Sequence, residues 1–302
     1  MQISRRTFVA TAAAGTAGVL FPFASRGAPL RNLEEDRARL EGWVRTLRVE
    51  GFGGARAPLG AAVARAGELA LGTPYLAHTL EAYLAAGGSP HEEPLTLRVG
   101  VFDCVTLVET AVAAARTAAA APGAEWERFA AEVERMRYRG GVRRGYPSRL
   151  HYFSEWIADG AARGLVRDLG PELGAVPDRR PLRFMSAHRA SYGALADDAV
   201  FAAVAERERA LDSVPRHRIP RSRLAEAATG LRSGDVLAFA TSIAGLDVTH
   251  TGLAHRGADG ALRVLHAPLS GGVVEISAGT LPEYVAGLRS CTGILAARPL
   301  PA

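Results

Sequence analysis

The sequence predicts an α+β fold in which a helical N-terminal half packs on an antiparallel sheet. Apolar residues recur at helical spacing through most of the chain up to residue 162, whereas after Gly230 they alternate in short runs separated by Gly, Asp and Pro. The 302 residues are 48% hydrophobic, which is enough for a large core and excludes a largely disordered chain. Helices that precede strands in this order favour two packed layers over alternating βαβ units.

The N-terminus has the pattern of an export signal. Arg5 and Arg6 precede the uncharged residues 10–23, and this arrangement resembles a twin-arginine (Tat) signal peptide. The apolar stretch is shorter than the ~20 residues that span a bilayer. We therefore expect residues 1–28 to be a cleaved Tat-type signal peptide and the mature protein to be periplasmic. Residues 29–302 are then expected to form one domain without stable membrane insertion; an uncleaved anchor is the alternative.

The basic charge of the chain does not predict a nucleic-acid partner. The formal charge is +5, and all 36 basic residues are arginines. Removal of residues 1–28 takes away three arginines and no acidic residue, which leaves a charge of +2. The remaining arginines are scattered, and the densest run, 137–149, is short. A nucleic-acid footprint needs basic side chains clustered on one face, so we expect no such partner.

The helical half can be predicted element by element. Asp103 is the expected N-cap of a long helix, and Pro122 and Gly123 end that helix. Residues 165–225 are rich in Pro and Arg and are weakly patterned apart from one helix, so we interpret them as an insertion. The expected helices are 33–48, 57–71, 104–121, 126–138, 150–162 and 197–210, with a short helix or strand at 78–86 and a strand at 95–101.

The strands expected after Gly230 cover 236–240, 248–255, 261–266, 273–276 and 289–298. A turn at 256–260 between the second and third strands would make His250 and His266 direct cross-strand neighbours on one face of the sheet. His255 has the opposite parity, and we expect it to be solvated. Asp235, after Gly234, is interpreted as a turn residue.

Cys104 is the candidate nucleophile. At a helix N-terminus, exposed N–H groups and the helix dipole favour the thiolate, and the same N–H groups can hold an oxyanion. His250 or His266 could act as the base and the other could orient it. The alternatives are a structural cysteine with core histidines, or a zinc site, although no tight ligand pair supports zinc. Cys291 is expected to be a buried small hydrophobe, with a disulfide partner as the alternative.

Five short motifs resemble a known family. In chain order they are Leu71-Gly-Thr-Pro-Tyr75, Phe102-Asp-Cys-Val-Thr-Leu-Val-Glu109, Gly234-Asp-Val-Leu-Ala238, Asp247-Val-Thr-His-Thr-Gly252 and Leu265-His-Ala267. Together they resemble the NlpC-type papain-like cell-wall hydrolase superfamily. Residues 148–157 and 184–188, with Tyr192, narrow the resemblance to its N-acetylmuramoyl-L-alanine amidase-like branch. The match runs from about residue 65 to the C-terminus, whereas residues 29–60 match nothing recognisable.

The resemblance implies a papain-like fold and amide hydrolysis through a thioester, with no cofactor and no metal. It makes Cys104 the nucleophile, His250 the base and His266 the residue that orients the base. The implied substrate is the N-acetylmuramoyl–L-alanine bond of peptidoglycan fragments, the anhydro-muropeptides. Cleavage between D-glutamate and a diamino acid, and non-catalytic muropeptide binding, are the alternatives, and we expect a monomer. The insertion at about 165–225 would shape the substrate site, and the candidate substrate-binding residues are Tyr75, Arg149, Tyr152, Ser186 and His188.

Overall fold

The computed structural model describes residues 33–54, 56–270 and 272–301. The chain divides into a unit of residues 1–31 and a unit of residues 32–302, and the fold described below belongs to the second. The signal peptide predicted for residues 1–28 lies outside the described residues.

The N-terminal half is helical, as the apolar spacing predicts. The element that matters most is α4, whose start carries Cys104 and whose interior is almost completely buried. The helices are α1 (Leu33–Leu47), α2 (Leu59–Leu69), α3 (Ala82–Ala85), α4 (Cys104–Ala119), α5 (Glu125–Arg137), α6 (Phe153–Ala162), α7 (Phe184–Ala187), α8 (Asp198–Ala210), α9 (Leu224–Gly230) and α10 (Leu281–Gly287).

The C-terminal part forms an antiparallel sheet, which together with the helices makes the fold α+β as predicted. The strand order is β2-β3-β8-β4-β5-β6-β7, and β1 also pairs with β8. The strands are β1 (Val166–Asp168), β2 (Val176–Pro177), β3 (His217–Pro220), β4 (Val236–Thr241), β5 (Val248–Arg256), β6 (Leu262–His266), β7 (Glu275–Ile276) and β8 (Cys291–Pro299).

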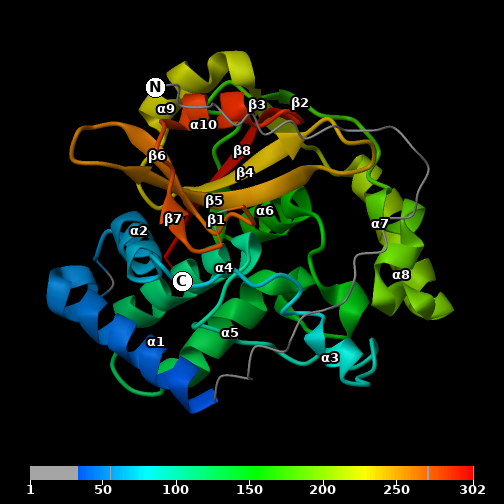
Figure 1. Cartoon of the computed structure of the whole chain (residues 1–302), viewed down its shortest axis with the longest axis horizontal. Coiled ribbons are helices and arrows are strands. Elements are labelled where there is room, and N and C mark those ends of the chain that lie inside the picture. The colour runs from blue at the N-terminus through cyan, green and yellow to red at the C-terminus, as the bar shows by residue number, and fades with distance from the viewer. Residues whose placement is uncertain (1–32, 55, 271, 302) are drawn as a thin grey trace, which may run out of the picture. The chain divides into compact units, whose positions relative to one another are not determined.

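Helices cover both faces of the sheet (Figure 1). The helices α1, α2, α4 and α5 pack on one face, where alternate residues of β4 and β5 such as Ala238 and Leu253 join a core with α4. The opposite face of the same strands, with Leu237 and Phe239, packs against α9 and α10. Since both faces are buried, β4 has no exposed residue. The expected packing of the helical half on the sheet is thus confirmed, and it includes the long helix that begins at Cys104.

None of the described helices is both long and apolar enough to cross a membrane. Even α4 has only 16 residues, fewer than the ~20 that span a bilayer.

The strand predicted at 95–101 is wrong. This segment is irregular, although Val99 is fully buried. Its backbone groups are satisfied by side chains instead of a partner strand: Asp36 Oδ1 accepts the N–H groups of Val99 and Gly100 at 2.8 Å, and Arg137 donates to the Thr96 carbonyl at 2.6 Å. An alternating apolar pattern therefore reflects burial here without sheet pairing.

The segment 165–225 contains more regular structure than its sequence predicts. The helix expected at 197–210 is confirmed as α8, with Asp197 as its N-cap. The strands β1 and β3 each pair with β8, far along the chain, so no local pattern reveals them. The helices α7 and α8 enclose a separate small core with Tyr152 and Met185.

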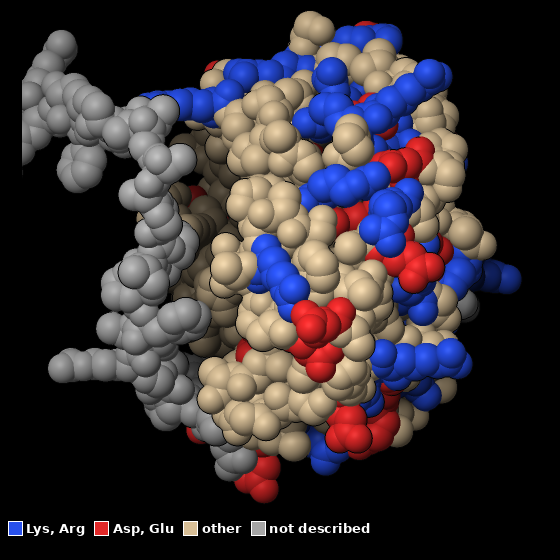
Figure 2. All heavy atoms as spheres, turned by 90° about the vertical axis from the view of Figure 1, so that its right-hand side faces the viewer, with Lys and Arg blue, Asp and Glu red and all other residues tan. Residues whose placement is uncertain are grey.

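The side of the molecule that carries α7 and α8 shows basic and acidic side chains interleaved (Figure 2). In this part of the chain Arg183 pairs with Asp212, Arg189 with Asp198, and Arg207 with the buried Glu155. These three arginines are therefore neutralised by neighbouring carboxylates.

Candidate active site

The start of α4 is fixed by a capping box. The Asp103 carboxylate accepts the N–H of Thr106 at 2.8 Å, and the Thr106 hydroxyl accepts the N–H of Asp103 at 2.9 Å. Asp103 is therefore the N-cap that the sequence predicts, and Cys104 is the first residue of the helix. The cap leaves the first N–H groups of α4 free of intrahelical partners, as at any helix N-terminus.

The thiol of Cys104 is protonated at neutral pH, contrary to the sequence-based expectation of a thiolate. Burial, followed by the nearby negative charge of Asp103, raises the pKa of Cys104 to about 11. Hydrogen bonds from the backbone and hydroxyl of Thr251 and from the N–H of Cys104 itself favour the thiolate, but they are outweighed. The prediction failed because the burial of the helix end was not visible in the sequence.

His250 and His266 form a hydrogen-bonded pair. His250 Nε2 lies 2.8 Å from His266 Nδ1, and the two rings meet edge to face with centroids 5.0 Å apart. Their predicted pairing is off by two residues: Leu253 pairs with Leu265, which places His266 diagonally from His250. Because a shift of two keeps the side-chain parity, both imidazoles still lie on one face.

Gly252 makes the diagonal contact feasible. A Cβ atom at this position would lie 2.9 Å from the Leu265 carbonyl oxygen and 3.1 Å from His266 Cβ. The absence of a side chain therefore leaves room for His266 to lean across β5 toward His250.

Both imidazoles are neutral at physiological pH. Burial, with a smaller effect of His266, lowers the pKa of His250 to about 3, and burial lowers the pKa of His266 to about 4. The His250 ring also stacks on Phe239, with centroids 5.7 Å apart. A neutral imidazole offers one nitrogen as a base, so the pair can accept a proton but does not start as part of an ion pair.

Thr251 and Tyr284 each influence or are influenced by Cys104 and each adjoin one of the two histidines, although no hydrogen bond within the described residues joins Cys104 to His250 or His266. Thr251 follows His250 in β5 and acts to lower the pKa of Cys104, and its buried hydroxyl makes no hydrogen bond in the described part of the chain. Tyr284 OH lies 3.5 Å from His266 Nδ1, and burial together with the charge of Cys104 raises the pKa of Tyr284 to about 12. Neither residue was predicted from the sequence: Thr251 could have been found from its place in the 247–252 motif, whereas nothing local marks Tyr284.

Tyr75 is the substrate-binding candidate that the structure places near Cys104. Burial, followed by the charges of Cys104 and Asp103, raises the pKa of Tyr75 to about 12, so its hydroxyl is a donor at neutral pH. A backbone bridge from Tyr75 to Phe102 holds it beside the residues that precede α4.

Arg149 lies in an internal ion-pair cluster. Its side chain is 7% exposed, its Nη1 donates to Glu81 at 2.6 Å, and its Nε lies 3.2 Å from Glu93. The guanidinium also stacks over Tyr146, and its Nη2 makes no hydrogen bond within the described residues. The structure thus pairs Arg149 with internal carboxylates.

The other three candidates lie in or beside the small core of α7 and α8. Tyr152 OH donates to the buried carboxylate of Glu208 at 2.5 Å, and the N–H of Ser186 approaches the same oxygen at 3.2 Å. His188 is exposed and stacks on Phe184, with centroids 4.2 Å apart. No contact joins these three residues to Cys104 among the interactions of the described residues.

Three secondary expectations have mixed outcomes. His255 is not solvated, because its Nε2 lies 2.8 Å from Glu68 of α2 and only 15% of its side chain is exposed. Asp235 is more than a turn residue, because it is buried and pairs with Arg298 at 2.6 Å. Cys291 is confirmed as a buried, free cysteine whose thiol donates to the Gly293 carbonyl.

Asp247, in the same motif as His250, ties β5 to α6. Its carboxylate accepts the N–H of Ser154, in the first turn of α6, and the N–H of Val248, which begins β5. Burial raises the pKa of Asp247. Asp247 belongs to the 247–252 motif, but its role as a link between two elements was not predictable from that motif.

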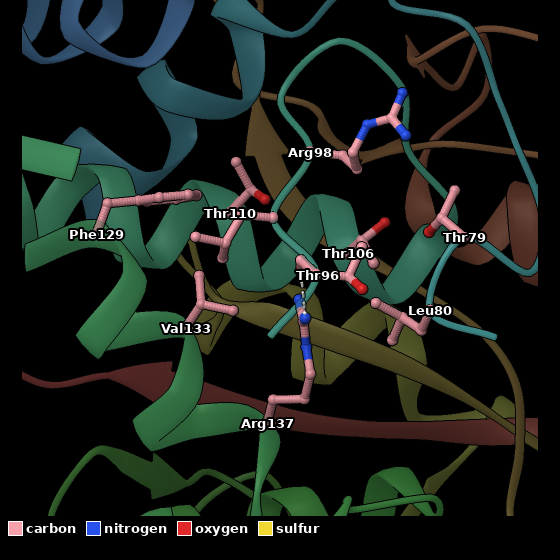
Figure 3. A pocket seen from close by; sticks show the side chains of 10 residues that line it. Thr79, Leu80, Thr96, Arg98, Thr106, Thr110, Phe129, Val133 and Arg137 are labelled. Atoms are coloured by element: carbon pink, nitrogen blue, oxygen red, sulfur yellow. Dashed lines mark hydrogen bonds between the residues drawn. The ribbon is translucent and has the colours of Figure 1, made fainter. Parts of the chain in front are cut away.

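Two small cavities lie next to these elements. The first, of about 10 Å³, lies between α4, α5 and residues 96–98, where Arg137 points toward the Thr96 carbonyl (Figure 3). The second, also about 10 Å³, lies beside Tyr152 and Glu208. Each has room for about one water molecule, so neither is a substrate pocket. No cluster of three or more His, Cys, Asp or Glu among the described residues could hold a metal ion.

Comparison with known proteins decides the family. Residues 65–293 match the AmiA-like family, described as N-acetylmuramoyl-L-alanine amidase-like. The chain belongs to this family. Both the cysteine at the start of α4 and the two histidines fall within the matched residues. No curated protein matches the sequence.

Several solved structures resemble this chain. An N-acetylmuramoyl-L-alanine amidase from Bacteroides uniformis is 30% identical, with a TM-score of 0.73 over 80% of this chain and 99% of that chain. A protein from Bacteroides fragilis described as a putative xylanase is 32% identical, with a TM-score of 0.69 over 77% and 99%. Protein LPG0564 from Legionella pneumophila, with 18% identity and a TM-score of 0.63 over 89% and 95%, shares the fold.

Proposed function

We propose that this protein is a papain-like cysteine amidase that hydrolyses the N-acetylmuramoyl–L-alanine bond of anhydro-muropeptides through a thioester. The observation that carries the proposal is the hydrogen-bonded pair of neutral imidazoles, His250 and His266, together with Thr251, which follows His250 in β5 and acts to lower the pKa of Cys104. The family and its amidase neighbours support the choice of bond.

The first step in this proposal is general-base attack. His250 keeps its proton on Nε2 and donates a hydrogen bond from it to His266 Nδ1, so His250 Nδ1 is the base; this nitrogen has no hydrogen bond within the described residues. Neighbouring side chains of a strand leave on opposite faces, and the pairing is regular from His250 onward, so His250 and Thr251 leave β5 on opposite faces. A bulge at Thr249, just before His250, bends the strand at this point. The proposal requires this bend to bring His250 Nδ1 within reach of the Cys104 sulfur.

The proton of Cys104 then moves to His250 Nδ1 as the sulfur attacks the amide carbon. The free N–H groups at the start of α4 and the Tyr75 hydroxyl would donate to the resulting oxyanion. The imidazolium returns its proton to the L-alanine nitrogen, the C–N bond breaks, and the lactyl carbonyl remains on sulfur as a thioester. Water, deprotonated by His250, cleaves the thioester to a carboxylate and restores the thiol.

The substrate contacts are proposals with different structural requirements. Tyr75 and the exposed His188 could reach a ligand without rearrangement. Arg149 would first have to exchange Glu81 for a ligand carboxylate, and Tyr152 and Ser186 would have to share or release Glu208. A cleaved Tat leader would place a monomeric enzyme in the periplasm, in contact with cell-wall fragments.

The test is a digest of defined anhydro-muropeptides, read by mass spectrometry. The wild-type protein is expected to release intact stem peptide and the peptide-free sugar, and Cys104→Ala is expected to lose this turnover by at least about a hundredfold. Cys291→Ala is the matched control, because it removes the other free cysteine, which is buried and whose thiol donates to the Gly293 carbonyl. Circular dichroism checks that both variants fold.

Each other result has a definite meaning. Retained turnover in Cys104→Ala would overturn the cysteine mechanism. Products that keep L-alanine and D-glutamate on the sugar would show an endopeptidase. Binding without turnover by the wild-type protein would show a muropeptide-binding protein. The rate of Cys104 alkylation at pH 6 would not distinguish an enzyme from a binding protein, because the raised pKa of Cys104 predicts slow alkylation in both cases.

A further inference from the structure

The outer nitrogen of His266 is buried and lacks a hydrogen bond. His266 is 1% exposed, and its Nε2 has no hydrogen-bond partner within the described residues. A buried polar atom without a partner lowers the stability of the folded protein, so the polar groups around it are candidates for its hydrogen-bond partner. The carboxylate of Glu275 faces it, with Oε1 at 3.8 Å from His266 Nε2.

The contacts at the other nitrogen decide where the His266 proton lies. His250 Nε2 approaches His266 Nδ1 at 2.8 Å, and the Tyr284 hydroxyl approaches the same nitrogen at 3.5 Å. If His250 Nδ1 is to act as a base, His250 must carry its proton on Nε2 and donate a hydrogen bond from this N–H to His266 Nδ1. A neutral His266 then carries its own proton on Nε2, which points toward an acceptor.

The sheet places Glu275 for this role. His266 and Glu275 are direct partners in the β6–β7 ladder. The Glu275 side chain is 46% exposed and belongs to a two-residue strand, so a small rotation can shorten the 3.8 Å separation. Apart from the approach to His266, the carboxylate of Glu275 makes no hydrogen bond or ion pair in the described part of the chain. It is therefore available to accept a hydrogen bond from His266.

We propose that Glu275 is a positioning residue, which fixes the Nε2–H tautomer of His266 and so keeps the basic lone pair of His250 on Nδ1. This inference rests on the proposed function, because it assumes that His250 is the base. The proton of Cys104 still moves only to His250; Glu275 stabilises the resulting imidazolium through the intervening neutral His266. A comparable carboxylate orients the histidine of serine-protease triads, where its loss gives the wrong tautomer.

The charged and titratable groups around the pair are few, so the effect of Glu275 can be isolated. His266 faces His250 on β5, Glu275 on β7 and Tyr284 on α10. Tyr284 in turn is affected by Cys104, Cys291 and Glu275. Among these groups Glu275 is the one carboxylate, so its removal changes the local charge by one unit.

The first test observes the tautomer directly. ¹⁵N NMR of the histidine rings, recorded on full-length Cys104→Ala, is expected to show His266 protonated on Nε2. With Glu275→Ala added, the signals should shift toward a mixture of the two tautomers, whereas Glu275→Gln, which keeps an acceptor oxygen, should preserve most of the Nε2–H form. Glu226→Gln, at an exposed carboxylate paired only with Arg223, is the control. An unchanged ¹⁵N pattern in Glu275→Ala would overturn the proposal.

The second test is kinetic. Glu275→Ala is expected to lower kcat about tenfold with less than a twofold change in KM, and to move the acid limb of kcat/KM to lower pH because the carboxylate that favours imidazolium is gone. An unchanged kcat and acid limb would also overturn the proposal. If the wild-type protein itself shows no amide turnover, the proposed function fails, and the NMR result still decides whether Glu275 sets the tautomer.

Discussion

At the scale of single residues, the site depends on a position without a side chain. Gly252 faces His266 across β5 and β6, and a Cβ there would lie 2.9 Å from both the Leu265 carbonyl oxygen and Val264 Cγ1. The third close neighbour is His266 Cβ, at 3.1 Å. The Leu265 carbonyl oxygen cannot move without shifting β6, and His266 Cβ cannot move without shifting His266. Side-chain chemistry alone therefore does not build the imidazole pair; the empty space at Gly252 is needed as well.

Gly252→Ala should accordingly separate the two imidazoles. We expect it to lower kcat/KM at least about tenfold and to cost about 1–3 kcal/mol of the free energy of unfolding, because β6 must move. Gly42→Ala is the matched control: it lies in α1 with nothing within 4 Å of the added Cβ, and should stabilise the protein by about 0.5–1 kcal/mol. Urea unfolding and the muropeptide assay measure both effects, and wild-type activity in Gly252→Ala would contradict the steric argument.

The residues of the site show what a sequence can and cannot predict. Residue chemistry and periodicity placed Cys104 at a helix start and put both histidines on one face. They could not show the burial that keeps the thiol protonated, nor that Glu68 of α2 binds His255. Both depend on contacts between segments far apart in the chain, which neither periodicity nor spacing encodes.

At the scale of elements, the start of α4 combines two opposing effects of one side chain. Asp103 caps the helix and fixes the geometry of Cys104, while its charge, second to burial, raises the pKa of the Cys104 thiol. The sequence predicted the cap because it depends on neighbouring residues. It did not predict the 95–101 segment correctly, because Asp36, more than 60 positions away, supplies the hydrogen bonds a strand partner would have made.

Two variants at Asp103 should separate these effects. Asp103→Asn keeps a capping oxygen and removes the charge, so alkylation of Cys104 by iodoacetamide at pH 8 should become several-fold faster with little change in stability. Asp103→Ala removes both, so alkylation should accelerate and the free energy of unfolding should fall by about 1 kcal/mol. The measurements are made with Cys291→Ala as background. Equal alkylation rates in all three proteins would show that Asp103 does not influence the sulfur.

At the scale of the whole molecule, the order of helices and strands was predictable, whereas the completion of the sheet was not. The helices and the hairpin of β5 and β6 follow from local periodicity. The predicted register was wrong by two residues, but the prediction of which side chains share a face of β5 was still correct. The strands β1 and β3 join the sheet only through β8, over distances that local patterns do not encode. The same long-range packing buries the site from both sides of the sheet and makes its histidines neutral.

This burial predicts loss of stability in acid. The pKa values of His250 and His266 fall from 6.5 to about 3 and about 4 in the folded protein. Below pH 6.5 these two histidines therefore bind more protons in the unfolded chain than in the folded protein. The folded state should then lose about 1.4 kcal/mol per pH unit for each of these imidazoles, down to their folded pKa. Buried His151, whose pKa is also lowered, adds to the loss, whereas Glu93, Glu109 and Asp247, whose pKa values are raised, oppose it.

A single substitution isolates the contribution of the site. The difference in unfolding free energy between wild type and His250→Asn, measured in urea from pH 7.5 to 4.5, should stay constant above pH 6.5. Below pH 6.5 it should shift in favour of the variant by about 1.4 kcal/mol per unit, because the variant no longer holds a buried group that resists protonation. Contributions from His151 and the carboxylates cancel in this difference. A difference independent of pH would mean that His250 titrates as it does in water, and the neutral imidazole pair assumed for catalysis would then be wrong.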